Sequence, residues 1–316
     1  MSAVHMGASD PDRGHRKEYA SGLCPGEAVE VRSENEILST LDRDGELEGL
    51  PFMLEMRKFC GKRYRVFKHL NEIIVEGSGR RRIRNTVVLE RVACDGQFNE
   101  GCGRRCLLFW KEAWLRRVTG QPSSHSAFSS SFMSIRTESP SKRIPFCQSA
   151  NLVHATVPIR FFDLNRYIWK IRCLSLRPAE GLRSFLTLLK STATGFLRHK
   201  EPVVVSGKLR QTPIATLNLQ PGELVEVKSK EEILATLDRK GRNRGLGLTV
   251  EMLKYCGKRY RVLRRLDKIV VEQKGQIRQV ANTVILENVT CDGSANGGCP
   301  RSCYCMWREI WLKRVE

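Results

Sequence analysis

Cysteines recur at a fixed spacing in two distant parts of the 316-residue chain, and thiols spaced in this way could bind a metal ion. The segment Ala93–Cys106 reads ACDGQFNEGCGRRC, and Thr290–Cys303 reads TCDGSANGGCPRSC. With one upstream cysteine each, the patterns are C-x33-C-x7-C-x3-C and C-x34-C-x7-C-x3-C. The two sets are Cys60, Cys94, Cys102 and Cys106, and Cys256, Cys291, Cys299 and Cys303. Four thiolates are a usual ligand set for tetrahedral zinc, so we predict two structural Zn²⁺ ions.

Two other roles for these thiols stay open. Buried cysteines can act as small hydrophobic residues, and cysteines can form disulfides or redox pairs. The first twenty residues contain no apolar stretch of the kind found in secretory signals, so we predict a cytoplasmic protein, where metal sites and free thiols are commoner than disulfides. Four cysteines have no counterpart in the other set and are interpreted as structural: Cys24, Cys147, Cys173 and Cys305.

The two cysteine sets belong to a longer internal repeat. LCPGEAVEVRSENEILSTLDRDGELEGL from Leu23 matches LQPGELVEVKSKEEILATLDRKGRNRGL from Leu219, and WKEAWLRRV from Trp110 matches WREIWLKRV from Trp307. Repeats of this length indicate two copies of one folded unit. The predicted parts of the chain are a disordered N-terminus (1–22), a first four-cysteine module (23–118), a Ser-rich linker (119–143), a basic helical segment with a linker (144–218) and a second four-cysteine module (219–316).

Local patterns within each module predict mostly β-structure. Val29 and Val31 alternate with polar residues as in a half-buried strand. Ser33 with Glu36 predicts a capping box before one short helix, and Ser229 with Glu232 repeats it in the second module. For the ending LLFWKEAWLRRV, a helix and a strand–turn–strand arrangement both fit the pattern, and we favour the second. The tryptophans of this ending would close an apolar interior, so we predict that Trp110, Trp114, Trp307 and Trp311 are core residues.

A turn-rich opening, a long insertion after the first strand, twisted central strands and an aromatic strand–turn–strand ending together resemble the SH3-like small barrels. The resemblance implies two SH3-like modules, and zinc would stabilise them because small barrels have little core. The tandem module, with its PGExVEV, CGKRYRV and WxExWL segments, also resembles one found in bacterial proteins without an established activity. That second resemblance transfers no functional residue. The predicted fold class is mainly β, with a helical central segment.

Positive charge is concentrated in short stretches of the repeat. The formal net charge of +20 and a pI near 9.7 favour a polyanionic partner, although a solvated basic surface would account for them too. In a strand, Arg63 and Arg65 share one face and Tyr64 lies on the other, so the arginines would contact phosphate groups. The predicted nucleic-acid-binding residues are Lys62, Arg63, Arg65, Arg80, Arg81, Arg82, Arg84, Lys258, Arg259 and Arg261.

The residue types argue for binding rather than catalysis. None of the six histidines has a counterpart in the other copy. The shared carboxylates stand among arginines and lysines, so we expect surface ion pairs for Glu55, Glu90, Glu112, Glu251, Glu287 and Glu309. We therefore predict a non-catalytic binding protein with nucleic acid as the first candidate partner. The alternatives are a protein-interaction scaffold, and peripheral membrane association through the basic, apolar stretch Ile159–Leu176.

Overall fold

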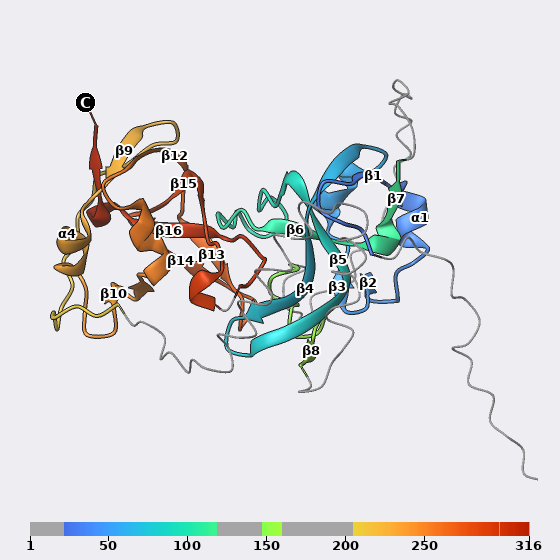
Figure 1. The fold of residues 1–316 in the computed structure, drawn as a ribbon, viewed down its shortest axis with the longest axis horizontal. Helices are drawn as coiled ribbons and strands as arrows, with labels where there is room; N and C mark the ends of the chain where they lie inside the picture. The colour runs from blue at the N-terminus through green and yellow to red at the C-terminus, as the bar shows by residue number, and fades with distance from the viewer. Residues whose placement is uncertain (1–21, 119–146, 160–204, 297, 316) are drawn as a thin grey trace, which may run out of the picture.

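The computed structural model describes residues 22–118, 147–159, 205–296 and 298–315. Within these ranges the chain is mainly β, as predicted, and two similar groups of strands lie side by side (Figure 1). Residues 22–118 are called module one below, and residues 205–315 module two.

The main sheet of module one follows the order β6–β5–β4–β1–β7, with antiparallel neighbours throughout. Val29 and Val31 are fully buried whereas Glu30 between them is not, which is the alternation that the sequence predicts. The strands are β1 (Ala28–Val31), β4 (Arg63–Val75), β5 (Gly79–Ala93), β6 (Leu107–Lys111) and β7 (Leu115–Arg117). Shorter strands are β2 (Glu46–Leu47), paired with β3 (Leu50–Pro51), and β8 (Val157–Pro158), paired with β5.

Module two repeats this sheet in the order β16–β15–β12–β9–β17. Its strands are β9 (Leu224–Val227), β12 (Arg259–Arg265), β15 (Thr283–Thr290), β16 (Tyr304–Arg308) and β17 (Leu312–Arg314), with the short pair β10 (Arg242–Asn243) and β11 (Leu246–Gly247). A separate hairpin of β13 (Lys268–Val271) and β14 (Gln276–Gln279) stands where β4 and β5 of module one continue unbroken. In module one the pairing of β4 with β5 shifts register between Leu70 and Glu72, which marks an irregularity such as a bulge. At the equivalent position of module two the strands are interrupted.

Short helices connect the strands. Both predicted capping boxes form, with Ser33 and Glu36 before α1 (Glu34–Leu38) and Ser229 and Glu232 before α4 (Lys230–Leu234). The remaining helical turns are 3-10 helices: η2 (Leu54–Phe59), η3 (Glu112–Trp114), η4 (Val250–Tyr255), η5 (Ser294–Asn296) and η6 (Glu309–Trp311).

The aromatic ending of each module is a strand, one helical turn and a strand, as predicted. Trp114 is fully buried and its indole N–H donates to the Thr40 hydroxyl at 3.0 Å. Trp311 repeats this contact with Thr236 at 2.9 Å. All four tryptophans predicted to be core residues have no exposed surface: Trp110, Trp114, Trp307 and Trp311.

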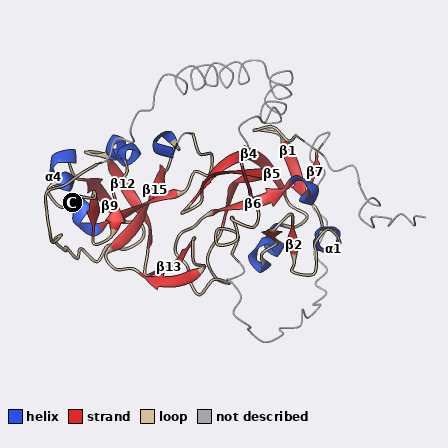
Figure 2. Cartoon of the chain, turned by 90° about the horizontal axis from the view of Figure 1, so that it is seen from below, coloured by secondary structure: helices blue, strands red, loops and turns tan. Residues whose placement is uncertain are grey.

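The modules meet through equivalent loops, and Figure 2 shows β13 lying on the side of module two that faces module one. The Gly103 amide of module one donates to the Lys268 carbonyl at 2.8 Å. The Arg104 guanidinium donates to the Val270 carbonyl at 3.0 Å, and its counterpart Arg301 donates to the Ile74 carbonyl at 2.9 Å. In each module the equivalent arginine therefore donates a hydrogen bond to the equivalent strand segment of the other module.

The described part of the central region, 147–159, consists of turns and β8 and packs on module one. The Gln148 amide donates to the Phe109 carbonyl and accepts from its N–H, both at 2.8 Å. The predicted Ser-rich linker (119–143) and the predicted N-terminal tail except Gly22 lie outside the described residues, as do 144–146 and 160–204 of the predicted basic helical segment. In the described residues, no helix has the length and apolar character needed to cross a bilayer.

Candidate functional site

The first candidate site is the loop that joins β5 to β6 and carries three of the predicted cysteines. The Cys94 N–H donates to the Cys106 carbonyl at 2.8 Å, which closes the loop. Gly96 has φ +80°, and a Cβ there would lie 2.0 Å from the Cys102 carbonyl oxygen. Gly293 in module two has the same conformation, with 2.3 Å to the Cys299 carbonyl oxygen. Loop closure by itself therefore requires these glycines.

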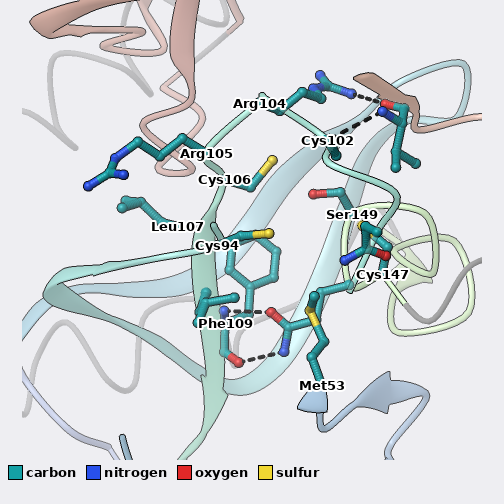
Figure 3. A pocket seen from close by; sticks show the side chains of 14 residues that line it. Met53, Cys94, Cys102, Arg104, Arg105, Cys106, Leu107, Phe109, Cys147 and Ser149 are labelled. Atoms are coloured by element: carbon teal, nitrogen blue, oxygen red, sulfur yellow. Dashed lines mark hydrogen bonds between the residues drawn. The ribbon is translucent and has the colours of Figure 1, made fainter. Parts of the chain in front are cut away.

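Three of the loop thiols of module one line one small cavity together with Cys147 (Figure 3). Its accessible volume is ≈ 20 Å³, which is room for about one water molecule. Burial raises the pKa of the Cys147 thiol to about 12, and it also raises the pKa of Cys94 and of Cys102. Sequence reasoning missed Cys147, since it has no counterpart in the other copy.

The fourth cysteine of each predicted set lies elsewhere. Cys60 lies near the charged side chains of Glu34 and Arg57. Its counterpart Cys256 lies near Glu231. Among the residues that the structure describes, no three His, Cys, Asp or Glu side chains gather closely enough to hold a metal ion. As placed, the thiols do not fit a tetrahedral zinc site. All eight shared cysteines are free thiols, whereas Cys24 is disulfide-bonded.

Four of the shared carboxylates are buried, so the expectation of surface ion pairs is wrong for them. They are Glu55, Glu112, Glu251 and Glu309, with at most 6% of their surface exposed. Glu55 accepts the Asp95 N–H at 2.9 Å through one of its carboxylate oxygens. Burial raises the pKa of Glu55. The cations that follow Glu55 in the sequence pair with other acids, Arg57 with Glu34 and Lys58 with Asp95, so sequence proximity misled the prediction.

The second buried pair anchors the chain where it enters each module. Glu112 accepts the N–H groups of Gly22 and Leu23, both at 2.8 Å. Glu309 accepts those of Leu217, Asn218 and Leu219 at 2.7, 3.1 and 3.0 Å. These carboxylates satisfy backbone donors, and the hydrogen bonds offset the cost of burying them.

The second candidate site is the outer face of the β4–β1–β7 part of the sheet. Arg63 and Arg65 are exposed on it, whereas Val66 is fully buried, which is the predicted alternation. Glu30 lies opposite both Arg63 and Arg116 in the strand register, and its carboxylate is 3.3 and 3.8 Å from them. Basic face one is defined as Lys62, Arg63, Arg65 and Arg116 around Glu30.

Module two carries the same arrangement. Glu226 lies opposite Arg259 and Lys313, at 3.2 and 2.8 Å. Basic face two is defined as Lys258, Arg259, Arg261 and Lys313 around Glu226. Sequence reasoning missed Arg116 and Lys313, although the repeated WLRRV and WLKRV endings could have indicated them.

The predicted run Arg80–Arg84 does not form one cationic surface. Arg80 pairs with Glu72 at 3.1 Å. Arg81 donates to the Thr156 hydroxyl and carbonyl, both at 2.7 Å, so it holds the segment that contains β8. Arg82 is half-buried, and Arg84 is exposed. The run therefore serves partly to dock 147–159 on module one.

Comparisons with protein-family models, curated proteins and solved structures find no match for this chain.

Proposed function

We propose that the protein binds nucleic acid without catalysis, through basic faces one and two. One observation supports this above the others: in both modules two cations on neighbouring strands flank one carboxylate, Glu30 in module one and Glu226 in module two. Each face keeps a net positive charge: in face one four cations lie near Glu30 and Glu36, the latter 2.9 Å from Arg116, and in face two four cations lie around Glu226. Two such faces on one chain can engage two stretches of a phosphate backbone, which raises the effective affinity.

The ion pairs within the faces do not prevent phosphate binding. The Arg63 and Glu30 side chains are 36% and 25% exposed, and exposed pairs of this kind contribute only about 0–1 kcal/mol. A phosphate group can therefore compete with Glu30 for the arginine. Lys62 and Lys258 add further exposed cations at the start of β4 and β12.

The aromatic residues next to the arginines are engaged in packing. Tyr64 meets Phe59 edge to face at 5.9 Å, and Tyr260 meets Tyr255 at 5.7 Å. Their rings face the module interior, whereas the arginines face outward. Binding through phosphate contacts positions a ligand without reading its bases, so we expect little sequence preference.

Two finer features belong to the same proposal. We propose that each module is an SH3-like small barrel, an idea supported by the shared sheet order and by the strand–turn–strand endings. Zinc binding also stays a prediction, with the two predicted four-cysteine sets as its ligands: Cys60, Cys94, Cys102 and Cys106, and Cys256, Cys291, Cys299 and Cys303. Bound zinc would cross-link each loop and would need these thiols as thiolates.

The proposal is tested by titrating the full chain with single-stranded RNA and with duplex DNA at several salt concentrations. We expect binding that weakens steeply as salt increases. The double variant Arg63→Ala with Arg65→Ala should reduce the salt slope by about 2, because two phosphate contacts are lost. The corresponding change at Arg259 and Arg261 should do the same.

Arg43 and Arg239 provide a matched control, since they are exposed at equivalent turns outside the basic faces. Replacing both with alanine lowers the net charge by the same amount and should leave the slope nearly unchanged. Equal effects of the control and the face variants would show that only net charge matters. Absence of binding at low salt would instead favour a protein-interaction scaffold.

A further inference from the structure

Module two contains a pocket that lies outside both basic faces. It is lined by Asn243 of β10 and by Arg308, the last residue of β16, and Arg244, Asn282 and Ile310 also line it. Its accessible volume is ≈ 100 Å³, enough for several water molecules or one small anion. Among the described residues, no carboxylate lines the pocket.

The Arg308 guanidinium is held rigidly at the wall of this pocket by neutral acceptors. Its Nε donates to the Asn243 carbonyl at 3.2 Å. One terminal nitrogen donates to the Ala281 carbonyl at 2.7 Å and to the Thr283 hydroxyl at 2.9 Å, and the other donates to the Arg244 carbonyl at 2.8 Å. A guanidinium has five N–H donors, so one stays available. These acceptors fix the plane of the guanidinium without neutralising its charge.

Arg244 brings a second positive charge to the same pocket. Its backbone adopts the left-handed conformation, with φ +48°, and its side chain is exposed. Burial lowers the pKa of Arg308, and the nearby charge of Arg244 lowers it further. Two like charges at one half-buried place repel each other, and a bound anion would relieve that repulsion.

Module one has a carboxylate in the same place. Glu48 corresponds to Arg244 and Lys111 to Arg308, and the Lys111 ammonium is 2.7 Å from the Glu48 carboxylate. Asn85, the counterpart of Asn282, donates to the same carboxylate at 3.2 Å. Module one therefore supplies its own anion, whereas module two has an arginine where that anion lies.

We propose that this pocket of module two binds the phosphate group of a small organic phosphate. Two guanidinium groups match the charge of a phosphate dianion, and Asn282 can hydrogen-bond its oxygens. Ile310 and Ile214, which is 58% exposed, line the same pocket and offer apolar contact to the organic part of the ligand. This inference goes beyond nucleic-acid binding, because neither arginine belongs to a basic face.

The test is calorimetric titration of the full chain with phenyl phosphate at constant ionic strength. We expect one saturable site, and the variant Arg244→Glu, which imports the acid of module one, should weaken binding at least about tenfold. Arg278→Glu makes the same charge change at an exposed position of β14 and should leave the affinity within about twofold. No saturable binding, or equal losses in the two variants, would overturn the proposal.

Further measurements distinguish phosphate binding in this pocket from binding at the basic faces and from a folding defect of the variant. Inorganic phosphate should bind more weakly than phenyl phosphate, because it cannot contact Ile214 and Ile310; equal affinity would contradict the organic part of the proposal. Arg244→Glu should keep its melting temperature and its RNA affinity, and Arg244→Gln serves as a second variant if it does not fold. RNA binding that falls as much as phenyl phosphate binding would place Arg244 in the nucleic-acid surface and overturn the proposal.

Discussion

The Cys299 sulfur of module two accepts a hydrogen bond from the backbone N–H of Ile74 in module one, at 3.3 Å. The equivalent pair in the opposite direction, Cys102 and Val270, has the same distance. Each module thus uses one loop thiol to satisfy a strand N–H of the other. Two of the cysteines predicted as zinc ligands therefore lie at the contact between the modules.

This contact contains one buried ion pair that can be tested. Arg301 and Glu272 are 8% and 3% exposed and make two hydrogen bonds of 2.8 Å. Glu272→Gln would leave the guanidinium buried without its counter-charge, so we expect a loss of about 3–5 kcal/mol in the free energy of unfolding. Urea denaturation at pH 7 measures it. Glu76→Gln, at the exposed counterpart position, should change stability by no more than about 0.5 kcal/mol. A similar small change for Glu272→Gln would contradict the role assigned to the pair.

The capping box of α1 predicts a dependence of stability on pH. The hydrogen bond from the Ser33 hydroxyl lowers the pKa of Glu36 to about 2; burial opposes this shift, and the Ser33 amide and the charge of Arg116 reinforce it. A carboxyl with a lowered pKa stabilises the fold above its unfolded pKa, and this contribution is lost as pH falls from about 4.5 towards about 2. Ser33→Ala should cost about 1 kcal/mol at pH 7 and reduce that acid dependence. Urea midpoints between pH 7 and pH 2.5 test this, with Ser78→Ala on an exposed turn as the control.

The tryptophans of the module endings are predicted to carry much of the core. Trp114→Ala should cost about 3–5 kcal/mol in the free energy of unfolding, because a fully buried indole leaves a large cavity. Phe67→Ala removes an aromatic ring that is 41% exposed and should cost much less. A folded, stable Trp114→Ala protein that has lost only ligand binding would show that this ring belongs to a binding surface.

Thiol reactivity and metal content together decide between the roles of the cysteines. Because burial raises the pKa of Cys147 to about 12, its alkylation by iodoacetamide at pH 8 should be far slower in the native protein than in urea. Mass spectrometry of alkylated peptides measures both rates.

Elemental analysis of protein purified without added metal should give about two zinc ions per chain if the zinc prediction holds. Metal-free protein that unfolds cooperatively and does not respond to a chelator would exclude it and leave buried thiols.

Features that depend on neighbouring residues could be predicted from the sequence. The capping boxes of Ser33 and Ser229 form because their hydrogen bonds span three residues. The outward direction of Arg63 and the inward direction of Val66 follow from the two-residue period of a strand. The burial of Trp114 and Trp311 follows from the repeat of an apolar ending that a small module must cover.

Features that depend on distant residues could not be predicted in this way. Cys147 joins the thiol cavity from a segment outside the repeat, so no spacing rule indicates it. Glu55 and Glu112 are surrounded in sequence by cations, yet they are buried because backbone amides from remote loops converge on them.

The sequence by itself determined the repeat, its mainly β character, which face of β1 and of β4 is apolar, and the outward position of the arginines. These features depend on local spacing. Only the tertiary structure decided which residues meet: Glu30 between Arg63 and Arg116, Arg301 against Ile74, and Arg244 beside Arg308. The physical reason is that contacts across the sheet and between the modules depend on register and loop closure, and many arrangements of distant segments are compatible with the same local pattern.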